Sequence, residues 1–98
     1  MIRIQGHDYK VIYDRSIGPR EGRGGCHYGA DCEITINPDN ADSQQREILI
    51  HELFEAIEST FNLQLDHNII QTFGAAFHQI IADNPHVFVL SLPVGDER

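Results

Sequence analysis

The chain has 98 residues, of which 41% are hydrophobic and 22% charged, and its net charge is −8. A chain of this length supports one hydrophobic core, so we expect a single domain. The longest apolar run, residues 73–77, is far shorter than the ~20 residues that cross a membrane, and residues 1–10 lack the hydrophobic region of a secretory signal. We therefore expect a cytoplasmic protein without a membrane partner, and the excess of carboxylates argues against nucleic-acid binding because it repels phosphate backbones.

The N-terminal residues predict a β-hairpin. Apolar and polar residues alternate at Ile2 and Ile4 and again from Tyr9 to Tyr13, with a turn-forming sequence between them. Residues 15–25 contain four glycines, one proline and three arginines. This composition predicts a solvated loop, with a lid that contacts an anion as the alternative.

A further strand segment is predicted within residues 26–37. It ends in Ile34 and Ile36 and follows a turn or bulge at residues 28–31. The two cysteines, Cys26 and Cys32, are expected to be reduced, half-buried thiols, with a disulfide or a metal pair as the alternative. No second Cys-x-x-Cys completes a zinc ribbon, so that fold is disfavoured.

The first of two predicted helices begins near Ser43, after a capping box at Asp42 and Gln45. It runs to about Phe61, where Asn62 offers a left-handed stop. The apolar residues expected to form its core face recur at helical spacing: Ile48, Leu49, Leu53, Ala56, Ile57 and Phe61.

The second helix is predicted from His67 to about Ala82, between a cap at Asp66 and a stop at Asn84 and Pro85. Its expected core face contains a glycine that would let the two helices approach closely: Ile70, Phe73, Gly74, Phe77 and Ile81. Residues 87–92 are expected to be extended. Residues 93–98 are expected to form a frayed tail outside a domain that spans residues 1–92.

The segment His51-Glu52-Leu53-Phe54-Glu55 places two metal-binding residue types one helical turn apart. Residues four apart share a helix face, with Cβ atoms roughly 5–6 Å from each other, so His51 and Glu55 can hold one metal ion. Zinc accepts carboxylate oxygen as well as imidazole nitrogen. Glu52 lies about 100° further around the helix axis, where it would flank the ion and could poise a bound water.

His67 is the predicted third metal ligand. The chain reverses between the helices, and His67 heads the stripe of residues that faces the first helix. Glu58 and Asp66 are reserve ligands. The alternative is that His51 and Glu55 form an ordinary solvated helix edge, since a pattern this short also arises by chance. A charged pair flanked by core residues is costly unless something compensates it, and this favours the metal site.

The order of these motifs resembles a minimal zincin and is similar to small phage and prophage proteins with a metallopeptidase-like domain, related in pattern to the ImmA/IrrE-like proteases. The resemblance covers roughly residues 26–86 and rests on Tyr28-Gly29-Ala30-Asp31, Ile34-Thr35-Ile36, Ile50-His51-Glu52-Leu53-Phe54-Glu55-Ala56-Ile57, Leu65-Asp66-His67 and Ile81-Ala82-Asp83-Asn84-Pro85. It implies an α+β fold in which a short N-terminal antiparallel sheet packs on two antiparallel helices.

The resemblance also implies roles for individual residues. His51 and Glu55 would bind zinc, Glu52 would be the general base, and a third ligand would follow downstream. An edge strand, assigned to residues 32–37, would hold a peptide by backbone pairing, with Tyr28, Ile34 and Ile36 as the substrate-binding residues. Glu55 replaces the second histidine of the family's motif, so manganese or iron is an alternative to zinc.

Three functions are compatible with these features. The first is a zinc peptidase, in which Tyr28 or an arginine of residues 15–23 could stabilise the oxyanion. The second is a non-catalytic metal-binding module that contacts a phage or host protein. The third is an acidic decoy that binds a nucleic-acid-binding partner. A domain this small could also need a homodimer or the metal itself for stability.

Overall fold

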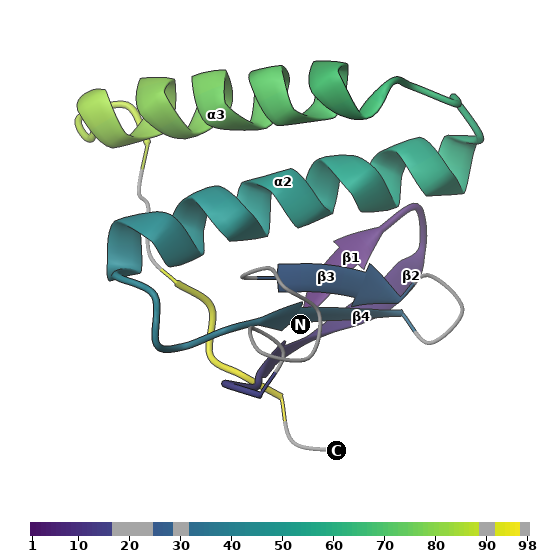
Figure 1. Ribbon diagram of the computed structural model, residues 1–98, viewed down its shortest axis with the longest axis horizontal. Coiled ribbons are helices and arrows are strands. Elements are labelled where there is room, and N and C mark those ends of the chain that lie inside the picture. The colour runs from purple at the N-terminus through teal and green to yellow at the C-terminus, as the bar shows by residue number, and fades with distance from the viewer. Residues whose placement is uncertain (17–24, 29–31, 89–91, 97–98) are drawn as a thin grey trace.

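The computed structural model of the chain describes residues 1–16, 25–28, 32–88 and 92–96. These residues form three layers: a four-stranded sheet, helix α2 (Asp42–Phe61) on the sheet, and helix α3 (His67–Asp83) on the side of α2 that faces away from the sheet (Figure 1). The helices run antiparallel to each other. The predicted α+β class with a short sheet and two antiparallel helices is therefore confirmed. Neither of these helices is long and apolar enough to cross a membrane.

Strands β1 (Ile2–Ile4) and β2 (His7–Tyr13) form the predicted antiparallel hairpin, in which Ile4 pairs with His7. The two turn residues, Gln5 and Gly6, have φ angles of 50° and 81°. Positive φ at both central positions gives the tight turn that matches the twist of the flanking strands. Gly6 adopts this conformation without the steric cost that a side chain would add.

The strand order departs from a simple antiparallel sheet. Strands β3 (Gly25–Tyr28) and β4 (Glu33–Ile36) pair antiparallel, and the order across the sheet is β1-β2-β4-β3. β4 is therefore an interior strand, and it pairs with β2 in parallel, with Ile34 opposite Val11. The expectation of a wholly antiparallel sheet is wrong at this pair. The reason is topological: after β2 the chain passes to the outer position as β3 and returns beside β2 as β4.

Helix α2 ends as predicted but begins differently. Asn62 has the expected left-handed conformation, with φ 52° and ψ 46°. The N-cap is Ala41, whose backbone N–H donates to Oε1 of Gln44 at 3.1 Å. The capping box predicted at Asp42 and Gln45 is therefore wrong by one residue. The Gln45 side-chain amide instead donates to the carbonyl oxygens of Pro38 and Asn40 in the preceding loop. Asp42 is the first residue of the helix and not its cap.

The core lies between the sheet and one face of α2 and contains Ile4, Tyr9, Val11, Ile34, Ile36, Leu49 and Ala56. Ile48 and Leu53 pack against this cluster as predicted. Ile57 and Phe61, also expected in the core, are 39% and 52% exposed. Both lie on other faces of α2, because Ile57 is about 100° and Phe61 about 140° around the axis from the sheet-facing Ala56. The sheet therefore covers a narrower stripe of α2 than the apolar pattern suggests.

Helix α3 packs on α2 through one side only. Ile70 and Gly74 are buried as predicted, and the ring of Phe77 lies 5.4 Å from that of Phe54 in α2, centroid to centroid. Phe77 is nevertheless 44% exposed, and Phe73 is 53% exposed. The prediction that Phe73 faces the core is wrong, because Phe73 lies about 100° around the helix axis from Gly74, which meets α2. α3 is the outermost layer, so no other described element covers that flank (Figure 1).

The C-terminal segment, residues 92–96, lies against β2. The backbone N–H of Asp96 donates to the carbonyl of Val11 at 2.9 Å, and the Asp96 carboxylate accepts from the N–H of Val11 at 3.2 Å. The hydroxyl of Tyr13 donates to the carbonyl of Pro93 at 2.7 Å. The expectation of a frayed tail is wrong for residues 93–96, because these contacts hold the segment against β2. Composition does not reveal such contacts, since they join residues that are far apart in the chain. Residues 97 and 98, and residues 89–91 of the expected extended segment 87–92, lie outside the described residues.

Candidate metal centre

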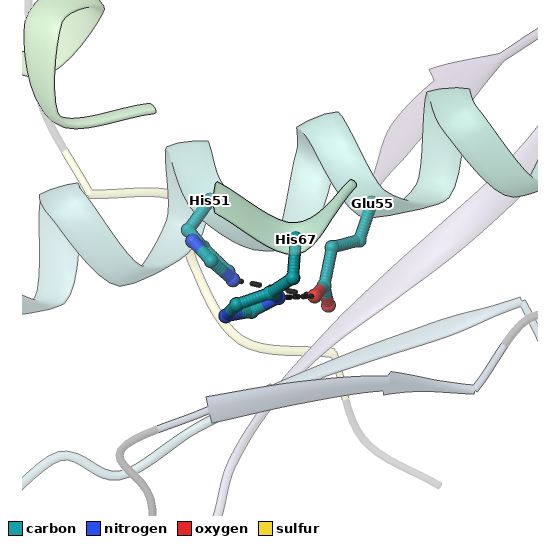
Figure 2. Close-up of side chains that lie close together, drawn as sticks. All are labelled: His51, Glu55 and His67. Atoms are coloured by element: carbon teal, nitrogen blue, oxygen red, sulfur yellow. Dashed lines mark ion pairs between the residues drawn. The ribbon is translucent and has the colours of Figure 1, made fainter. Parts of the chain in front are cut away.

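His51 and Glu55 project from the same face of α2, one helical turn apart (Figure 2). Nε2 of His51 lies 3.3 Å from Oε1 of Glu55, and the two side chains are 24% and 19% exposed. Helix geometry alone accounts for this pairing, since residues four apart stand on one face. The pair is therefore half-buried but open to solvent on one side.

His67 reaches the same point from the first turn of α3. Its Nδ1 lies 3.5 Å from the same carboxylate oxygen of Glu55, and its side chain is 64% exposed. The imidazole rings of His51 and His67 meet edge to face, with centroids 5.3 Å apart. Figure 2 shows the three side chains converging. The structure thus brings together the three ligands that the sequence predicted, and this group could hold a metal ion.

The loop before α3 fixes the position of that helix's first turn. The backbone N–H of Leu65 donates to Oε1 of Glu58 at 3.2 Å, and the Asp66 carboxylate accepts from the N–H of Asn68 at 3.0 Å. The second contact is the N-cap predicted for this helix. Glu58 and Asp66, the two reserve ligands, thus serve the loop and the cap. Neither belongs to the metal-binding group found among the described residues.

Gly74 sets the distance between the two helices beside the site. A Cβ atom on this residue would lie 3.4 Å from Cα of His51 and 3.7 Å from its Cβ. At this level no side chain of α3 stands between the backbones of the two helices. The prediction that Gly74 lets the helices approach closely is confirmed, and the close approach is what allows a residue of α3 to share a site with α2.

The two spacings between Glu55 and the histidines are those that two ligands of a tetrahedral metal ion would have. Zinc binds imidazole nitrogen and carboxylate oxygen at ~2.0–2.2 Å, and two ligands of a tetrahedron at such distances are ~3.3–3.5 Å apart. The distances from Oε1 of Glu55 to His51 and His67, 3.3 and 3.5 Å, agree with this value. All three donor atoms lie within 4.8 Å of one another. Two histidines and one glutamate are also a ligand set of catalytic zinc sites, which leave a fourth position open.

Glu52 lies on a different face of α2 from the metal-binding group. It is 2% exposed and shares the sheet-facing stripe with Leu49 and Ala56. Helix geometry places it about 100° around the axis from His51. Glu52 therefore faces the sheet and is not a member of the metal-binding group.

The predicted substrate-binding strand is wrong. Ile34 and Ile36 are 0% exposed, and β4 pairs on both sides, with β2 and β3, so neither residue can contact a peptide. The edge strand on this side is β3, which ends at Tyr28 and contacts α2. The side chain of Tyr28 lies outside the described residues. No local signal identifies β3 as the edge, because strand order is set by contacts between distant segments.

The predicted basic loop is described only at its start. Arg15 is exposed, and its guanidinium lies 3.8 Å from the carboxylate of Asp39. The other arginines of the loop, Arg20 and Arg23, lie outside the described residues, and so does the side chain of Cys26. The lid, the oxyanion donors and the state of the thiols therefore stay predictions.

Comparisons of the chain with protein-family models, with curated proteins and with solved structures found no match. The resemblance to zincins therefore rests on the sequence motifs. The structural observation that bears on function is the convergence of His51, Glu55 and His67 on one point.

Proposed function

We propose that the chain is a zinc-dependent peptidase whose ion is held by His51, Glu55 and His67. The observation that carries this proposal is the convergence of their donor atoms, with two distances to the Glu55 oxygen, 3.3 and 3.5 Å, that suit tetrahedral zinc. The carboxylate also makes manganese or iron acceptable, since harder ions prefer oxygen ligands. A zinc ion in such a site would act as a Lewis acid that lowers the pKa of a bound water to about 7 and polarises a carbonyl group.

Glu52 is the general base of the proposed reaction. It follows His51 directly in the chain and is 2% exposed, so its carboxylate is shielded from bulk water. A carboxylate in this position can accept a proton from an attacking water and return it to the leaving amine. In this proposal the reacting peptide bond would lie near the sheet edge, on the side of α2 that carries Glu52.

A peptide is the substrate that the sheet favours. β3 is an edge strand, and it contacts α2, the helix that carries His51 and Glu55. An edge strand offers a row of backbone N–H and C=O groups to which an extended peptide can add as a further strand. This places the proposed substrate strand one position further out than the sequence indicated, on β3 instead of β4.

The proposal is tested by replacing Glu52 with glutamine. Glu52→Gln should bind one equivalent of zinc like the wild type and hydrolyse a fluorogenic peptide library about 10² to 10⁴ times more slowly, the usual contribution of a general base. Glu58→Gln is the matched control, since it removes a carboxylate from the same helix and keeps the oxygen that accepts from Leu65. It should cleave like the wild type. Undiminished cleavage by Glu52→Gln would exclude this mechanism.

The second candidate is a non-catalytic module that keeps the metal and binds another protein. It is favoured by the large apolar side chains that α3 leaves exposed, among them Ile69, Phe73 and Ile80. Exposed apolar surface of this kind is typical of interaction sites. Stoichiometric zinc together with no turnover of any peptide in the library would favour this function over the peptidase.

A further inference from the structure

Helix α3 carries a second apolar stripe on a flank about 100° around its axis from the side that meets α2. Ile69, Phe73, Ala76 and Ile80 follow one another at intervals of four, three and four residues, which places them on one helix face. All four are exposed, and the three large side chains retain 42%, 53% and 43% of their accessible surface. We call these four residues the outer stripe. A helix with apolar residues on two sides is suited to burial on two sides, and α2 covers only one of them.

The outer stripe is large enough for a protein interface. A half-exposed Phe or Ile leaves roughly 80–110 Å² in contact with water, so the stripe and the neighbouring Phe77 expose roughly 400 Å² of apolar surface. Pairing two such surfaces would bury roughly 800 Å² of apolar area, to which the flanking polar residues add. An interface of this size belongs to the small class of protein–protein contacts, whose occupancy depends on protein concentration.

We propose that two copies of the chain associate through the outer stripe, with α3 packed antiparallel on α3 of the second copy. The spacing of the stripe is the same in both directions. A two-fold axis midway between residues 74 and 75 sets Ile69 opposite Ile80, and Phe73 opposite Ala76. The largest side chain of the stripe thus meets the smallest, so the surface is complementary to itself, as a two-fold interface requires.

The distribution of charge favours a second copy over a membrane surface. α3 contains no Lys or Arg, and its only acidic residue is Asp83 at its C-terminal end. Helices that lie on membranes carry basic residues on their polar face, and α3 has none. The net charge of −8 opposes association of two copies at long range, but no charged side chain would lie at the centre of the contact. The antiparallel arrangement also sets opposite ends of the two helix dipoles side by side.

The test is the mass of the protein in solution, measured by sedimentation velocity over a range of concentrations. The wild type should sediment as a dimer of about 22 kDa, twice the 11.1 kDa chain. Ala76→Glu puts two like charges close to the two-fold axis and should weaken the dimer by a factor on the order of 100. Ala75→Glu is the matched control: Ala75 is exposed on the same helix but lies about 100° away from Ala76, off the stripe, and should leave the dimer intact.

A charge-reversal experiment separates loss of contact from loss of fold. Ala76→Glu and Ala76→Lys should each be monomeric with the wild-type circular dichroism spectrum, and an equimolar mixture should form a heterodimer because the opposite charges meet at the axis. A wild-type monomer at high protein concentration would overturn the proposal and leave the stripe for a different protein. A mixture that stays monomeric, or equal weakening by Ala75→Glu, would overturn it as well. The proposal does not depend on the metal centre, so the dimer should persist in a chelator.

Discussion

Replacing Gly74 with leucine should weaken metal binding without changing any ligand. A Cβ at this position lies 3.4 Å from Cα of His51, which is an ordinary contact, so Gly74→Ala fits between the helices. Alanine also has a higher helix propensity than glycine, by ~0.8–1.0 kcal/mol in a helix interior, and should make the domain slightly more stable. Gly74→Leu adds three further carbon atoms at the same contact and must push α3 away from α2.

The leucine variant should lose metal affinity for a geometric reason. Overpacking of this kind costs about 1–3 kcal/mol, and a metal site tolerates ligand displacements of only ~0.2 Å. His67 moves with α3 while His51 and Glu55 stay on α2, so we expect zinc affinity to fall at least about tenfold, the effect of a loss of 1.4 kcal/mol. Urea unfolding measures the stability change, and competition with a chromophoric chelator measures the zinc affinity. Wild-type zinc affinity in Gly74→Leu, or loss of binding in Gly74→Ala, would refute this account of the helix contact.

Two further predictions concern the metal and the C-terminal segment. Zinc at a hundredfold excess over its dissociation constant should stabilise the fold by about 2.7 kcal/mol, because it binds only the folded chain, in which the ligands of the two helices meet. This should raise the melting temperature by about 10–20 °C. Scanning calorimetry should show most of this shift lost in His67→Ala, and an equal shift in that variant would contradict the assignment of His67 as a ligand. Acid should release residues 92–96 from β2. The hydrogen bond from the Val11 N–H and the nearby terminal amino group hold the pKa of the Asp96 carboxyl below its usual 3.8. The contact therefore stabilises the fold above pH 3.8 and weakens as the pH falls through the lowered pKa. Hydrogen exchange read by NMR should show protection of the Val11 amide decreasing over this range in the wild type, and absent at every pH in Asp96→Ala; protection that persists in Asp96→Ala would contradict the contact.

The helices and the metal-binding group could be predicted because their signals are local. The apolar periodicity and the stop at Asn62 define α2, and the cap at Asp66 defines the start of α3. The pairing of His51 with Glu55 follows from helix geometry alone. The placement of His67 needed only one further inference, that the chain turns back between two helices.

The strand order and the exposed side of α3 could not be predicted from local patterns. Ile34 and Ile36 alternate with polar residues in the same way on an edge strand and on an interior strand, so the sequence does not show that β4 lies between two neighbours. Phe73 belongs to an apolar stripe that periodicity detects, but periodicity does not tell which of two stripes faces α2. In the C-terminal segment, the contact between Asp96 and Val11 joins residues 85 positions apart.

The most direct test of the metal centre is the metal content of protein purified without a metal-affinity tag, measured by elemental analysis after equilibration with zinc. The wild type should contain about one equivalent of zinc, and His51→Ala and His67→Ala should contain almost none, because each removes a ligand from one of the two helices. His78→Ala is the matched control, since it removes a histidine of α3 outside the metal-binding group, and it should retain the ion. No zinc in the wild type, or equal zinc in the wild type and His67→Ala, would contradict a metal centre built from both helices.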